Sequence, residues 1–147
     1  VKYGFVAERI AELALKFQIK AIAFDQYRIK YLEPELDEAG VGVQLIQHGQ
    51  GFYKAADSGL WMPHSIELFE GLLDDKEIEI HLNPCLRWNA ASAVIETDQK
   101  NNRIFAKKKS TGRIDGVVAA AMAIGAADGE VEDDFNLDDF LSRPMSM

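Results

Sequence analysis

Segments with helical spacing of apolar residues alternate along the chain with short apolar runs. Helical spacing predicts helices over residues 5–17, 27–39, 63–73, 83–95 and 114–127. A short apolar run predicts a strand over residues 19–24, and short segments predict further strands over 41–46, 77–81 and 103–107. This alternation favours an α/β domain with a largely parallel sheet covered by helices on both faces.

Particular residues mark where several of these elements begin or end. Gly40 should end the helix over 27–39, and Pro34 should kink that helix or mark a second start within it. Asn83 followed by Pro84 is typical of a helix N-cap with proline in the first helical position. Residues 47–62 contain several glycines and show no clear period, which indicates a loop.

The net charge of −8 is concentrated at one end of the chain. Seven acidic residues and a single base, Arg143, lie in residues 128–147 and give that segment a charge of −6, which leaves −2 for residues 1–127. We therefore predict a domain over 1–127 and an acidic C-terminal tail over 128–147. The folded part can still present a basic face to nucleic acid, because binding depends on where Lys and Arg cluster.

Composition excludes several classes of protein. The single cysteine, Cys85, cannot form an internal disulfide, and a reducing, cytosolic setting is expected. No apolar run reaches the length of a membrane-spanning helix, the N-terminus does not resemble a signal peptide, and the sequence contains no Walker A motif. We therefore expect no membrane partner and no ATPase activity in this chain.

Two carboxylates occupy positions where ligands commonly bind in α/β domains. Asp25 follows the apolar run AIAF, at the end of a predicted buried strand, although it could instead cap the next helix. Asp115 lies at the start of the last helix, where the helix dipole alone could also favour it. Gly116 follows in a position where glycine lowers helix propensity without an evident local gain.

Such a pair could hold a divalent metal ion. Mg²⁺ is bound by one or two carboxylates together with water and phosphate oxygens, and paired ions can clamp both oxygens of a phosphodiester displacement. A two-metal site needs at least one further carboxylate. Only Asp98, in the polar turn over 98–102, offers a weak third candidate in the sequence.

Basic residues precede Asp115. No acidic residue lies between Arg103 and Asp115, and the segment contains Lys107, Lys108, Lys109 and Arg113. These four side chains could hold a phosphate backbone beside a metal site. The alternative is a solvated strand edge protected by lysines. His48, His64 and His81 lack metal-ligand spacing and are predicted to be surface or loop residues.

Four stretches, in this order and spacing, resemble the C-terminal nuclease domain of tailed-phage terminase large subunits. They are AIAFDQYR at 21–28, QHGQGF at 47–52, LNPCLRWN at 82–89 and KKKSTGRIDGVVA at 107–119, and the resemblance extends over about residues 1–127. It implies an RNase H-like mixed sheet flanked by helices. The family's first acidic ligand lies on a β-hairpin strand upstream of the first helix, so we expect this chain to lack its N-terminal β-hairpin strands.

The resemblance also implies an activity, a cofactor and partners. Domains of this family cut concatemeric DNA with Mg²⁺ or Mn²⁺, in which case Asp25 and Asp115 would be metal ligands of a two-metal endonuclease. Double-stranded DNA, the phage portal and the small terminase subunit are the expected partners, in the host-cell cytoplasm. Two other hypotheses remain at this point. One is a catalytically incomplete fragment that binds DNA or the portal, and the other is a doubly wound, parallel-sheet domain that binds a small ligand.

Overall fold

The computed structural model describes residues 2–81 and 83–131, in which helices outnumber strands. The elements are α1 (Tyr3–Lys16), β1 (Ala21–Phe24), α2 (Ile29–Glu38), β2 (Gln44–Gln47), α3 (Met62–Asp74), α4 (Pro84–Ser92), β3 (Ile95–Thr97), β4 (Arg103–Phe105) and α5 (Asp115–Val131). The predicted acidic tail lies outside the described residues from position 132 onward. None of the described helices is long and apolar enough to cross a membrane.

The strands form two small sheets and not the single, largely parallel sheet that the sequence predicts. Strand β1 pairs with β2 in parallel, with Ala21 opposite Gln44, because α2 provides the crossover between them. Strands β3 and β4 form an antiparallel hairpin, with Ile95 opposite Phe105, because only a short turn connects them. The hairpin contradicts the parallel-only order expected of a doubly wound small-ligand domain.

Several predicted elements differ from the structure in their presence or their bounds. Residues 77–81 form no strand, because the amides of Glu77 and Ile78 bond to Leu72 O at the end of α3 and none of the described strands lies alongside them. The predicted helix over 83–95 ends at Ser92, since Ala93 is extended and the chain continues into β3. Helix α5, by contrast, continues to Val131, beyond its predicted end at 127.

Predicted caps are confirmed where the signal is local. The side chain of Asn83 accepts a hydrogen bond from Leu86 N at 3.1 Å, and Pro84 occupies the first helical position of α4. Gly40 closes α2 with a φ of 69°, in the left-handed region that favours glycine. Pro34 lies inside α2 without starting a second helix.

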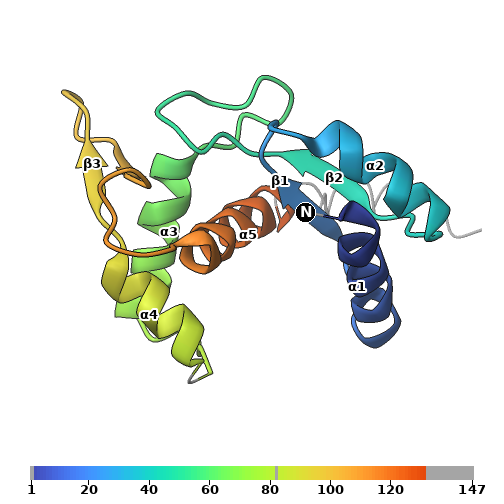
Figure 1. Cartoon of the computed structure of the whole chain (residues 1–147). Helices are drawn as coiled ribbons and strands as arrows, with labels where there is room; N and C mark the ends of the chain where they lie inside the picture. The colour runs from blue at the N-terminus through green and yellow to red at the C-terminus, as the bar shows by residue number, and fades with distance from the viewer. Residues whose placement is uncertain (1, 82, 132–147) are drawn as a thin grey trace, which may run out of the picture.

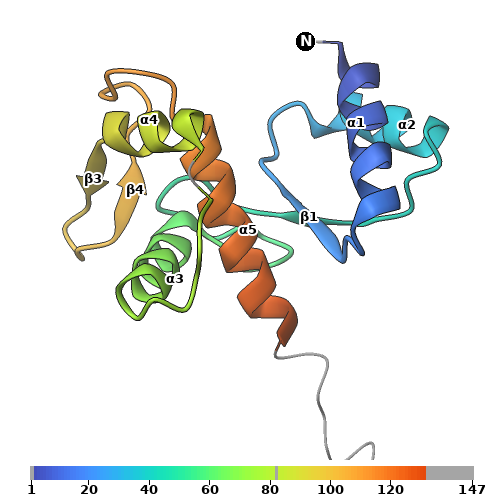
Figure 2. The ribbon, with the colours of Figure 1, turned by 90° about the horizontal axis from the view of Figure 1, so that it is seen from below.

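Helix α5 packs in the middle of the molecule, between the α3–α4–hairpin group and the α1–α2–β1–β2 group (Figures 1 and 2). Its apolar face meets α3, and the buried core consists of Met62, Ile66, Phe69, Ile114, Val117, Val118, Ala121 and Met122. Ala23 of β1, Leu86 of α4 and Phe105 of β4 pack against this core. The central position of α5 therefore brings its first and last turns against different parts of the fold.

Candidate functional site

Asp25 lies directly after β1, at the C-terminal edge of the parallel pair, and its side chain is exposed. The helix-cap interpretation does not hold for this residue. The N-cap of α2 is Arg28, and no side chain caps that helix end. Asp25 therefore does not cap the following helix, which would be the simplest structural explanation for an aspartate after a strand. Its position at the end of β1 fits ligand binding.

Asp115 is the first residue of α5, and its side chain is also exposed. The residue before it, Ile114, is buried in the core and has no side chain that could cap a helix. The favourable interaction of a carboxylate with the helix dipole still applies at this position.

The amide group of Gly116, in the first turn of α5, donates its hydrogen bond to a residue of another helix. Asn89 of α4, only 9% exposed, accepts a hydrogen bond from Gly116 N at 2.7 Å through its Oδ1. A Cβ at position 116 would lie 2.9 Å from that oxygen, so a larger residue would require the Asn89 side chain to shift. This contact explains Gly116, and it fixes the backbone next to Asp115.

The two carboxylates are carried by elements that pack against one core. Strand β1 lies against α5, and Ala23, two residues before Asp25, packs on the cluster that contains Ile114 and Val118. Exposed carboxylate oxygens suit a hydrated Mg²⁺ or Mn²⁺ ion. Within residues 2–81 and 83–131, however, no three His, Cys, Asp or Glu residues are grouped so that they could hold a metal ion. Asp25 and Asp115 thus provide the type of ligand atom that such an ion prefers. That the two residues bind a metal together remains a prediction.

Asp98, the weak third candidate, serves the hairpin between β3 and β4. Its carboxylate accepts hydrogen bonds from Lys100 N at 2.8 Å, from Asn102 N at 2.9 Å and from Asn102 Nδ2 at 2.8 Å. The bonds from Asn102 are the main cause that lowers the pKa of Asp98. A carboxylate committed to three donors at a turn is structural, so Asp98 is not a candidate ligand.

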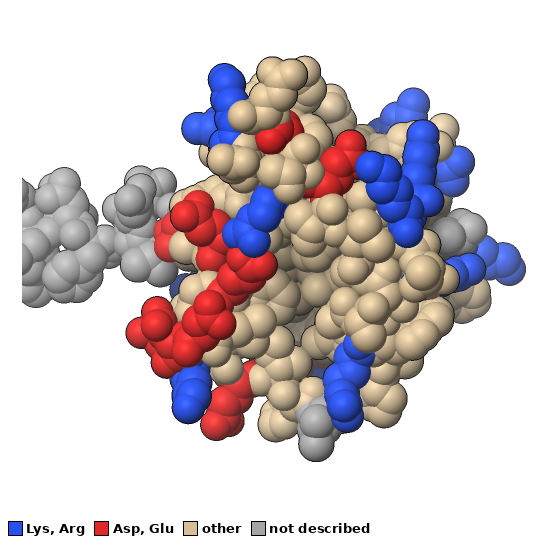
Figure 3. All heavy atoms as spheres, turned by 90° about the vertical axis from the view of Figure 1, so that its left-hand side faces the viewer, with Lys and Arg blue, Asp and Glu red and all other residues tan. Residues whose placement is uncertain are grey.

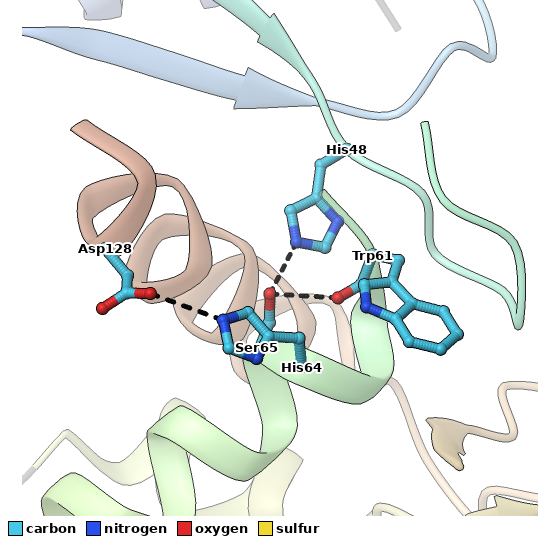
Figure 4. Close-up of polar contacts among 5 residues, drawn as sticks. All are labelled: His48, Trp61, His64, Ser65 and Asp128. Carbon is cyan, nitrogen blue, oxygen red and sulfur yellow. Dashed lines mark hydrogen bonds and ion pairs between the residues drawn. The ribbon is translucent and has the colours of Figure 1, made fainter. Parts of the chain in front are cut away.

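His48 lies in the loop after β2, as one alternative of the prediction has it, but it is buried, at 1% exposure, and is not a surface residue. It follows β2, and its ring connects to α3 through Ser65 (Figure 4). Nδ1 donates to Gly49 O at 2.9 Å, so Nε2 must accept, and Ser65 Oγ donates to it at 2.7 Å. His64 and His81 are exposed as expected, and His64 lies 3.4 Å from Asp128 of α5.

The buried imidazole should make stability depend on pH. Burial lowers the pKa of His48 below its ordinary value of 6.5, while the Gly49 carbonyl and the negative charge of Asp25 act in the opposite direction. Below about pH 6.5 the unfolded chain therefore binds a proton that the folded chain resists. We expect the free energy of unfolding to be constant above this pH and to fall as the pH drops toward the lowered pKa.

Urea unfolding at pH 7.5, 6.5 and 5.5 would measure this dependence. His48→Gln, which does not titrate, should flatten the loss between pH 6.5 and 5.5, whereas His64→Gln, which removes an exposed imidazole, should retain it. A parent protein whose stability is the same at pH 7.5 and 5.5 would contradict the prediction.

The basic residues lie in the turn that follows β4, and Lys107, Lys108, Lys109 and Arg113 are all exposed. Their position beyond the end of the strand argues against a role in protecting its edge. Lys107 Nζ donates to Gln50 Oε1 at 2.8 Å, while Lys109 forms an ion pair with Glu96 at 3.3 Å. No described ion pair involves Lys107, Lys108 or Arg113.

Charges are segregated on the face that carries the hairpin and α4. Figure 3 shows most acidic side chains of this face toward its left edge, with a few basic side chains among them, and further basic side chains toward the top, right and lower margins. This part of the fold also contains a mainly apolar groove of about 510 Å³, whose lining includes Phe69, Leu73, Leu86, Ile95 and Phe105 together with Glu70 and Arg87. The net charge therefore does not prevent local basic regions, as expected from the sequence.

With this geometry established, comparison with known proteins defines the class. Residues 1–130 match the model of the terminase large subunit endonuclease domain, and the chain belongs to that family. The large subunit of the terminase from Enterobacteria phage HK97 is 38% identical over 148 residues, which cover 100% of this chain and 28% of that protein. The crystal structure of the HK97 bacteriophage large terminase matches 86% of this chain and 25% of that chain, with a TM-score of 0.75 and 35% identity.

Proposed function

We propose that this chain is the metal-dependent DNA-cutting domain of a phage packaging enzyme, with an RNase H-like fold and a C-terminal position in the full-length protein. The observation that carries the proposal is the placement of Asp25 and Asp115. Both are exposed carboxylates, one at the end of β1 and one at the start of α5, in a member of a nuclease-domain family. The fold, with two small sheets and a central helix, is similar to that of the HK97 enzyme.

Each group has a defined task in this proposal. Asp25 and Asp115 would hold Mg²⁺ or Mn²⁺ ions, which supply an activated water and stabilise the charge of the leaving oxygen. A two-metal site requires at least one more acidic ligand besides Asp25 and Asp115. Asn89 holds the backbone at Asp115, and Lys107, Lys108, Lys109 and Arg113 bind the DNA backbone with little base readout.

The same proposal names the partners. Double-stranded DNA is the substrate, concatemeric DNA in the host-cell cytoplasm is its source, and the portal and the small terminase subunit are the protein partners. These assignments rest on family membership, and the chain spans only about a quarter of the length of its HK97 relatives.

One observation favours a second function. The described residues include no group of three potential metal ligands, which suits a module that binds DNA or the portal without cutting. The basic turn would serve such a module equally well.

Plasmid nicking separates the two functions. The 147-residue chain, incubated with supercoiled plasmid and Mn²⁺, should convert it to the open circular form, and excess EDTA should prevent the conversion. Binding of a duplex at low salt without nicking in Mn²⁺ or Mg²⁺ would overturn the nuclease proposal and support the binding module.

A further inference from the structure

A second hollow lies between the glycine-containing loop and the basic turn. Its volume is about 320 Å³, and its floor is formed by the apolar side chains of Met62, Ile104, Phe105 and Val118. Its polar lining consists of Gln50, Glu96, Lys107, Lys108 and Lys109. Three lysines around one hollow create a cationic site unless each is neutralised by an acid.

The three lysines are not equivalent. Lys109 is paired with the carboxylate of Glu96, 3.3 Å away, which cancels its charge locally. Lys107 is held by an amide oxygen, that of Gln50 at 2.8 Å, which orients the ammonium group without cancelling its charge. An ammonium group has three donors, so Lys107 retains two for a further acceptor.

The hollow adjoins the helix face that carries Asp115. Residues three and seven positions along a helix share one face, so Asp115, Val118 and Met122 lie in a row on α5. Val118 forms part of the floor, and Gln50 Nε2 approaches Met122 Sδ at 3.4 Å. Val118, which contributes to the floor of the hollow, therefore lies about one helical turn, roughly 5 Å along the axis, from Asp115.

We propose that this hollow binds a phosphate of the DNA backbone close to the phosphodiester that is cut, with Lys107 and Lys108 as the charged contacts and Gln50 as the residue that holds Lys107 in place. The inference rests on the proposed function and adds a subsite and a residue to it. Gln50 lies in a loop 57 residues before Lys107, which is why no local pattern connects the two.

The salt dependence of DNA binding tests the subsite without reference to cleavage. Binding of a fluorescein-labelled 20-base-pair duplex would be followed by anisotropy in EDTA between 50 and 200 mM KCl. Each phosphate contact contributes roughly 0.9 to the slope of log K against log salt. We expect Lys107→Ala and Lys108→Ala each to lower the slope by about that amount. Lys109→Ala should lower it by less than half as much.

Gln50→Glu provides the sharpest variant. It places a carboxylate against Lys107, as Glu96 is placed against Lys109, and should reproduce the slope of Lys107→Ala although Lys107 is intact. Lys16→Ala, at the exposed end of α1, removes the same charge far from the hollow and should leave the slope unchanged.

The outcomes distinguish the subsite from the function on which it rests. If the parent chain binds DNA but Lys107→Ala matches Lys16→Ala, or Gln50→Glu retains the parent slope, the subsite is overturned while the proposed function stands. If the parent chain binds no DNA even at 50 mM KCl, the proposed function is overturned, and the subsite with it.

Discussion

Replacing Asp115 with alanine is expected to reduce metal-dependent plasmid nicking by more than a hundredfold while leaving the fold intact. Loss of groups that merely support a metal ligand typically costs about 10–100-fold, so loss of a ligand itself should exceed that range. Asp115 is exposed and makes no described ion pair, and its contribution to stability is limited to about 0.3–1 kcal/mol from the helix dipole. Initial nicking rates in Mn²⁺ and thermal melting of the same preparations would measure both effects.

Asp128→Ala is the matched control for this experiment. It removes another exposed aspartate from the same helix, 13 residues further on and therefore about 20 Å away along the axis. Its loss of the exposed contact with His64 should cost less than about 1 kcal/mol and leave nicking unchanged. Equal nicking by the parent and by Asp115→Ala would remove Asp115 from the site.

The largest effect on stability is expected from Gly125→Ala, at the opposite end of α5. A Cβ at position 125 would overlap Ser65 Oγ and would lie 2.9 Å from Ser65 Cβ and 3.3 Å from His48 Nε2. Both neighbours are 1% exposed and bonded to each other, so neither can move aside freely. Overpacking of this kind costs about 1–3 kcal/mol, which exceeds the gain of up to about 1 kcal/mol from alanine in a helix.

Gly71→Ala is the corresponding control in α3. A Cβ added at position 71 would meet no neighbouring atom within 4 Å, so only the helix propensity changes, and stability should rise by about 0.5–1 kcal/mol. Urea unfolding of the two variants should therefore give changes of opposite sign. A neutral or stabilising Gly125→Ala would show that α5 is not packed on His48 and Ser65 in this way.

Local signals allow much of the fold to be predicted. All five helices form near their predicted positions because their periodicity is local, and the ends marked by Asn83 with Pro84 and by Gly40 are local signals too. Residues 77–81 alternate polar and apolar side chains as a strand does, but a strand also needs a neighbour, and no pattern within the segment supplies that information. The end of α4 differs from its predicted position because small apolar residues there suit a helix and a strand alike.

In the candidate site, too, some residues can be predicted from local sequence signals and others cannot. Asp25 and Asp115 stand out in the sequence because each lies at the end of an element, although their role stays a prediction. The residues that sequence reasoning misses act across long separations. Asn89 reaches Gly116 from 27 positions away and Ser65 reaches His48 from 17. Only Gly116, which is costly in a helix without a local reason, gives a signal that some distant group approaches it.

The supply of a cap to α5 by another helix has a consequence for how the chain folds. An isolated helix frays first where its initial amides lack acceptors, and the acceptor for Gly116 arrives only when α4 has packed against α5. We expect the turn that carries Asp115 to become ordered late, after the α3–α5 core has formed. In a chain that is still incompletely folded, the carboxylate of Asp115 would have no fixed position, so any metal binding that depends on Asp115, as proposed, would appear only after α4 has packed against α5.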